Sequence, residues 1–95
     1  ILLLDITDIA AFADYFIICS GTSRRQLDAL QGAIREELKK ADERILAKNV
    51  EGEPDSGWIL MDFSGVIVHL FDPEMRDYYR LEDLWRNARV VARIQ

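Results

Sequence analysis

The stretch WILMDFSGVIVHLF, residues 58–71, decides how the fold of this chain is predicted. Two runs rich in β-branched and aromatic residues flank Ser64-Gly65, a pair that favours a tight turn, so the stretch predicts a β-hairpin. A two-residue turn places Phe63 opposite Val66, and residues opposite each other share one face of a sheet. The register of the whole hairpin therefore follows from its turn.

The two faces of this hairpin differ in chemistry. We expect a helix to pack on the first face, which is entirely apolar and consists of Ile59, Met61, Phe63, Val66, Val68 and Leu70. Aromatic anchors among a few polar groups are typical of protein-binding surfaces, and the second face has this mixture. It consists of Trp58, Leu60, Asp62, Ile67, His69 and Phe71. The alternative is that a second helix of the chain covers this face, with Asp62 in solvent and His69 hydrogen-bonded internally.

The region before the hairpin predicts two further strands and a long helix. ILLLDI (1–6) and DYFIICS (14–20) are short apolar runs that end at turn-forming residues, which indicates buried strands. Ser23 and Gln26 fit a capping box at the start of a helix. Apolar residues at helical spacing follow, and they are Leu27, Leu30, Ile34, Leu38 and Ala41.

Less regular patterns lie on either side of the hairpin. Residues 45–57 predict a short strand followed by a loop that contains Gly, Pro and Asp. After Pro73, apolar residues recur at intervals of three and four, which predicts a second amphipathic helix. The recurring residues are Tyr78, Leu81, Trp85, Ala88 and Ala92.

Length and composition predict one globular domain over residues 1–95. Of the 95 residues 49% are hydrophobic, and the formal charge is -5, so binding to a nucleic acid backbone by electrostatics alone is disfavoured. Cys19 is the only cysteine, which excludes an intrachain disulfide. Neither a transmembrane helix nor a signal peptide is predicted. Because the chain begins at Ile1 without a methionine, we expect it to be a fragment.

The sequence contains few of the residues that catalysis would require. SGTSRR (20–25) has the composition of a phosphate-binding loop, but a metal-dependent nucleotidyltransferase also needs clustered carboxylates. Asp62 is well placed, yet Leu60 and Ser64 stand where a second aspartate of an Asp-x-Asp pair would be. The chain has one His and no recognisable cluster of zinc ligands. We therefore predict no catalytic residues, no metal and no cofactor.

Three segments together resemble the ribosomal silencing factor family, also called the Iojap family, which occurs in bacteria, mitochondria and chloroplasts. They are DYFIICSGTSRRQ, then EGE with WILMDFSGVIVHLF, and RDYYRLEDLW. The resemblance implies a single α/β domain with a mixed central β-sheet flanked by helices, like a nucleotidyltransferase without the catalytic carboxylates. It also implies a helical segment before the first strand, and we expect this sequence to lack that segment. The matching positions are Asp14, Tyr15, Phe16, Gly21, Ser23, Gln26, Trp58, Asp62, His69, Tyr79, Leu81, Glu82, Leu84 and Trp85.

The resemblance also implies a function that needs no reaction. Family members bind the large ribosomal subunit through universal protein fourteen of its subunit-joining face, block the small subunit and so repress translation. Organellar members are tied to large-subunit assembly, and homodimers are known. The resemblance implies a cytoplasmic protein in a bacterium, or a mitochondrial or chloroplast one in a eukaryote, without direct nucleic-acid specificity. We expect the partner-binding residues to be Trp58, Leu60, Asp62, His69 and Tyr79; the alternative is a nucleotidyltransferase-like metal-dependent enzyme.

Overall fold

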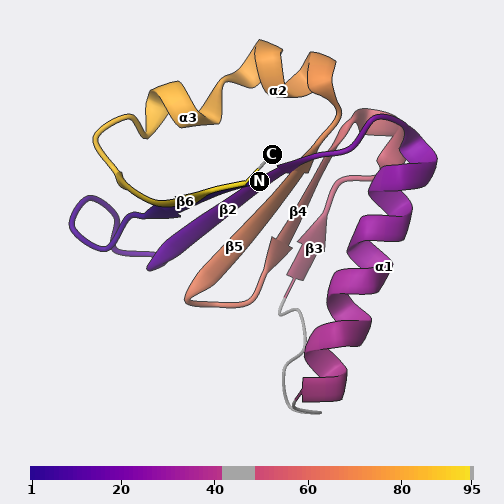
Figure 1. Cartoon of the computed structure of the whole chain (residues 1–95), viewed down its shortest axis with the longest axis horizontal. Coiled ribbons are helices and arrows are strands. Elements are labelled where there is room, and N and C mark those ends of the chain that lie inside the picture. Colours follow the sequence, from indigo (N-terminus) through magenta and orange to yellow (C-terminus); the bar gives the residue numbers. More distant parts are fainter. Residues whose placement is uncertain (42–48, 95) are drawn as a thin grey trace.

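A computed structural model, which describes residues 1–41 and 49–94, shows a mixed sheet with helices on both faces (Figure 1). The strand order is β3-β4-β5-β2-β1-β6, and only β2 and β5 pair in parallel. The predicted α/β class is therefore confirmed. The strands are β1 (Leu2–Asp5), β2 (Tyr15–Ser20), β3 (Asn49–Glu51), β4 (Trp58–Asp62), β5 (Val66–Phe71) and β6 (Arg89–Arg93). The helices are α1 (Arg24–Ala41), the 3-10 helix η1 (Pro54–Ser56), α2 (Pro73–Tyr79) and α3 (Leu81–Leu84).

The β4–β5 hairpin has the predicted register. Trp58 lies opposite Phe71, and the Phe63 N–H donates to the Val66 carbonyl at 2.9 Å across the two-residue turn. Ser64, rather than Gly65, takes the left-handed conformation, with φ 73°. The Asp62 carboxylate accepts the Ser64 N–H at 2.8 Å, which helps to hold this turn.

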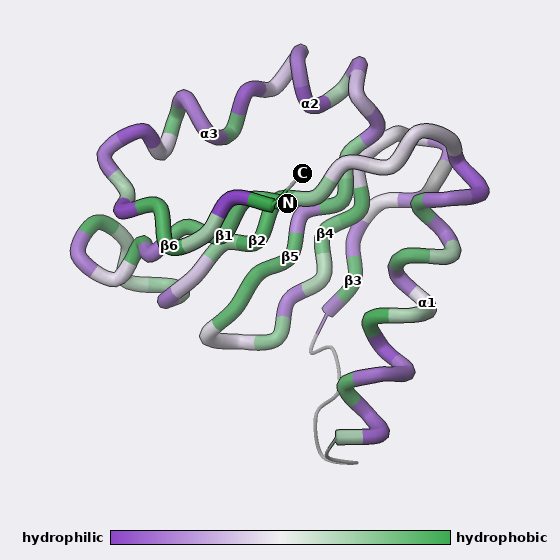
Figure 2. The backbone as a smooth tube through the Cα atoms, viewed as in Figure 1, coloured by the Kyte–Doolittle hydropathy of each residue, from purple (hydrophilic) through white to green (hydrophobic). Residues whose placement is uncertain are grey.

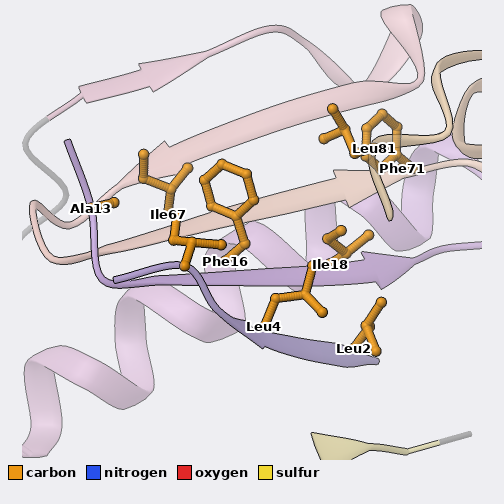
Figure 3. Close-up of a cluster of buried hydrophobic side chains, with 9 residues drawn as sticks. Leu2, Leu4, Ala13, Phe16, Ile18, Ile67, Phe71 and Leu81 are labelled. Carbon is orange, nitrogen blue, oxygen red and sulfur yellow. The ribbon is translucent and has the colours of Figure 1, made fainter. Parts of the chain in front are cut away.

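Two apolar layers lie on opposite faces of the sheet, because side chains alternate along each strand. The α1 layer contains Leu27 of the helix, with Leu30 and Ile34 at its border, and confirms that a helix covers the apolar face of the hairpin. Leu81 of α3 lies beside Phe71 in the other layer (Figure 3). Apolar residues are concentrated in the strands, whereas α2 and α3 carry many polar residues (Figure 2).

The start of α1 is capped, but not as a reciprocal box. The Ser23 hydroxyl accepts the Gln26 N–H at 3.2 Å, as predicted. The Gln26 side-chain oxygen accepts from the Thr22 N–H at 2.5 Å and from the Thr22 hydroxyl at 2.8 Å, rather than from Ser23. Residues 20–23 therefore serve to connect β2 to α1. The short strand predicted within 45–57 is β3, and residues 45–48 of that prediction lie outside the described residues.

The prediction of one amphipathic helix after Pro73 is wrong. Helix α2 ends at Tyr79, because Arg80 adopts left-handed backbone angles of φ 48° and ψ 53°. After α3 the chain forms β6, which pairs with the open edge of β1. The β-branched pair Val90-Val91 favours a strand, and pairing satisfies backbone groups of both strands. Intervals of three and four do not distinguish a continuous helix from two short helices and a strand.

Candidate protein-binding site

Three of the five predicted partner-binding residues line one shallow pocket of about 270 Å³. Trp58 and Leu60 reach it from the same face of β4, because they are two residues apart on a strand. Tyr79 reaches it from the end of α2, which begins directly after β5. The full lining is Glu51, Gly52, Ser56, Trp58, Leu60 and Tyr79.

Trp58 is the aromatic centre of this pocket. Its ring stacks on Phe71 of the neighbouring strand, with centroids 5.1 Å apart, and lies 4.7 Å from the Tyr79 ring. Its own backbone N–H donates to the Ser56 hydroxyl at 3.4 Å. Trp58 is half-buried, so its indole is held in place while part of it stays exposed to solvent. A rigid, partly exposed aromatic ring is well suited to anchor a protein partner.

His69 lies beneath Trp58 and is only 4% exposed. The Trp58 indole N–H donates to His69 Nδ1 at 3.2 Å, which assigns the proton of the neutral ring to Nε2. Burial lowers the pKa of His69 to about 4, so the ring is neutral near pH 7. The Phe16 ring contacts it edge-on, with centroids 4.7 Å apart. In this structure His69 therefore makes the internal hydrogen bond of the alternative interpretation and offers almost no surface to a partner.

Asp62 lies on the same face of β4 as Trp58 and Leu60, but at the far end of the strand. It is half-buried and is not among the residues that line the pocket. It is four positions along the strand from Trp58, which corresponds to about 13 Å. The structure thus brings Trp58, Leu60 and Tyr79 together. Asp62 is a separate polar residue on the same face of β4.

Sequence reasoning missed the contribution of the segment before β4. Glu51 lies opposite Leu60 in the β3–β4 pairing and so reaches the pocket rim. Gly52 packs against the backbone of Trp58 with a φ of 86°, where a side chain would be both strained and crowded. The EGE motif was the available signal, because it contains the carboxylates of Glu51 and Glu53 around that glycine.

Two carboxylates at strand ends, those of Asp5 and Asp62, accept hydrogen bonds from neighbouring groups. Asp5 accepts from the Thr7 hydroxyl at 2.6 Å and from Arg89 at 3.0 Å, and these hydrogen bonds lower its pKa. Asp62 accepts from Ser64. Within residues 1–41 and 49–94, no three His, Cys, Asp or Glu side chains form a group that could hold a metal ion. Burial raises the pKa of Cys19, which disfavours the reactive thiolate.

No helix in the described part of the chain has both the length and the apolar character needed to cross a membrane.

Comparisons with known proteins point to one family. The family model described as ribosomal silencing factor during starvation matches residues 1–95. The ribosomal silencing factor RsfS of Bacillus subtilis is 43% identical over 89 residues, covering 93% of this chain and 73% of that protein. The mouse protein named mitochondrial assembly of ribosomal large subunit protein 1 is 36% identical, over 78% of this chain and 33% of its own length. A crystal structure from Chromobacterium violaceum superposes with a TM-score of 0.80 at 34% identity, covering 87% of this chain and 68% of that one.

Proposed function

The chain belongs to the ribosomal silencing factor family, and from this membership we propose that it silences translation by binding the large ribosomal subunit. In finer detail, we propose that it binds universal protein fourteen on the subunit-joining face and blocks the small subunit sterically. One relative is a bacterial protein, and the mouse relative is named for the assembly of the mitochondrial large ribosomal subunit. The proposal therefore applies to ribosomes of the bacterial type.

The pocket around Trp58 is the observation that carries this proposal. It combines the exposed parts of two aromatic rings and Leu60 with a carboxylate at its rim, that of Glu51. Tryptophan and tyrosine supply much of the binding energy in protein interfaces, because large rigid rings bury area with little loss of conformational freedom. The chain carries a formal charge of -5, which suits a basic protein partner.

The two polar residues of the predicted site have different roles in this proposal. Asp62 is half-buried at the end of β4 and provides a carboxylate for a basic side chain of the ribosomal protein. His69 acts as a positioning residue, because its Nδ1 holds the Trp58 indole at 3.2 Å. The partner then contacts Trp58, Leu60, Tyr79 and Asp62, while His69 supports the surface from below.

The proposed mechanism is exclusion by volume, and no bond is made or broken. A domain bound to the subunit-joining face occupies space that the small subunit needs. Its effect on translation then depends on its affinity and its concentration relative to large subunits. Self-association, which the family resemblance implies, remains a prediction that sedimentation of the purified domain can test.

Binding to purified large subunits tests the surface. We expect Trp58→Ala to weaken binding at least about thirtyfold, which corresponds to the loss of roughly 2 kcal/mol at a hot-spot residue. Asp62→Lys reverses one charge and should also weaken binding, whereas the matched reversal Glu36→Lys on the exposed side of α1 should not. Circular dichroism must show that each variant remains folded. Unchanged binding by both Trp58→Ala and Asp62→Lys would contradict the proposed surface.

Subunit joining tests the mechanism separately. Large subunits incubated with the domain should fail to form complete ribosomes when small subunits are added, as measured by light scattering or gradient sedimentation. The Trp58→Ala variant should permit joining at the same concentration. A domain that binds the large subunit and leaves joining unchanged would exclude the steric block but retain the binding proposal.

A further inference from the structure

Arginine is concentrated at the C-terminal end of this otherwise acidic chain. After Asp83 the sequence contains three arginines and no acidic residue. The structure places the first of them, Arg86, with Arg80 and Asn87 around a hollow of about 440 Å³. We call this the arginine hollow; its lining is Tyr79, Arg80, Asp83, Leu84, Arg86 and Asn87.

We propose that the arginine hollow binds the phosphate backbone of ribosomal RNA next to the protein bound at the Trp58 pocket. This inference rests on the proposed function, because it assigns a second contact on the same subunit. Tyr79 lines both the pocket and the hollow, so the two sites share a wall. The parts of the large subunit that surround a partner bound at the Trp58 pocket would therefore face the arginines.

The charges around the hollow favour an anion. No described carboxylate forms an ion pair with Arg86, whereas Arg89 is held by Asp5 at 3.0 Å. Arg80 has only loose ion pairs, at 3.7 Å to Asp77 and 3.9 Å to Asp83. The guanidinium of Arg86 is thus available to donate to phosphate oxygens in a bidentate manner. The side-chain amide of Asn87 supplies further donors.

The turn that carries Arg86 is anchored from below. Trp85 is half-buried and contacts Phe16 edge-on, with ring centroids 5.1 Å apart, and Phe12 at 5.9 Å. The Ala88 N–H donates to the Trp85 carbonyl at 2.9 Å, which closes the turn. Because the backbone at Arg86 is held on both sides, binding would mainly have to order the arginine side chain. A smaller ordering cost leaves more of the contact energy for binding.

Ribosomal RNA fits this surface better than a second protein does. The pocket side of Tyr79 presents the carboxylate of Glu51, whereas the other side presents two arginines, Arg80 and Arg86, beside the one carboxylate of Asp83. A ribosomal protein on the subunit surface is surrounded by RNA, whose phosphates give a dense negative charge. The net charge of -5 still disfavours binding to free nucleic acid, so the phosphate contact would add to a complex that the protein contact has already formed.

Salt dependence of subunit binding tests this contact. The dissociation constant for purified large subunits is measured between about 50 and 200 mM KCl for the original domain, for Arg86→Gln and for Arg35→Gln. Arg35 is exposed on α1 and provides the same loss of charge away from the hollow. We expect the original domain to lose about threefold more affinity over this range than Arg86→Gln does, which is the effect of one phosphate contact. Arg35→Gln should match the original domain.

A second measurement separates RNA from protein. The isolated universal protein fourteen should bind the original domain and Arg86→Gln equally well if Arg86 contacts RNA. The RNA contact would be overturned if Arg86→Gln lost as much affinity for the isolated protein as it loses for intact subunits. It would also be overturned if Arg86→Gln and the original domain showed the same salt dependence with intact subunits. Either result would leave the proposed function intact. Failure of the original domain to bind large subunits at all would overturn both proposals.

Discussion

Protonation of His69 should make the stability of this domain depend on pH in a window that begins near pH 6.5, above the range in which carboxylates titrate. Burial lowers the pKa of His69 from 6.5 to about 4. The unfolded chain therefore binds a proton between these values while the folded chain does not, so stability falls as the pH is lowered through this window. Each pKa unit is worth 1.36 kcal/mol, which gives a loss of up to about 3 kcal/mol between pH 6.5 and pH 4.

The hydrogen bond to Trp58 gives this loss a structural cause. Nδ1 of the neutral ring accepts the Trp58 indole N–H, but a protonated ring carries a hydrogen on Nδ1 and would face donor with donor. His69→Asn offers an oxygen near the position of Nδ1 and does not titrate, so it is the matched control. It should be less stable than the original at pH 7.5, because it fills less of the buried site.

Urea unfolding, followed by circular dichroism at intervals from pH 7.5 to pH 4, measures the free energy of unfolding for both proteins. We expect the original domain to lose about 1.4 kcal/mol per pH unit in the middle of the window, and His69→Asn to lose much less there. Asp5 also contributes to acid sensitivity, because hydrogen bonds lower its pKa from 3.8, but its contribution is lost below this window. Equal slopes for the two proteins between pH 6.5 and pH 4 would refute the assignment to His69.

Three further predictions concern stability and one concerns ligands. Leu27→Ala should lower the free energy of unfolding by about 2–5 kcal/mol, because this side chain is fully buried under α1; a loss below 1 kcal/mol in urea unfolding would argue against that packing. Asp72→Ala should cost about 1 kcal/mol, because its carboxylate caps α2 by accepting the Met75 N–H at 2.7 Å, whereas unchanged stability would exclude a contribution from the cap. Arg80→Gly should raise the melting temperature relative to Arg80→Ala, because position 80 has a φ of 48°; the opposite order would contradict the left-handed conformation. Mg²⁺ with ATP should leave the melting temperature unchanged, and a shift that Asp62→Asn abolishes would favour the enzyme alternative.

Local pattern was sufficient for the hairpin. Its turn and its alternation of apolar residues involve neighbours within a few positions, and the register of Trp58 opposite Phe71 follows from them. The same short-range information placed Leu27 on the buried side of α1 and Ser23 at its cap. The C-terminal region was mispredicted, because its spacing fits both a helix and the observed chain of α2, α3 and β6.

The candidate site depended on contacts between residues far apart in the sequence. Tyr79, and not the 75% exposed Tyr78, packs on Trp58 because of where α2 lies against the sheet. His69 is buried because Phe16 of another strand and the Trp58 indole enclose it. A periodic pattern indicates which residues are apolar, but it does not indicate which distant side chain packs against each of them. The family and the hairpin could therefore be inferred from the order of the residues, whereas the pocket required packing between separate elements.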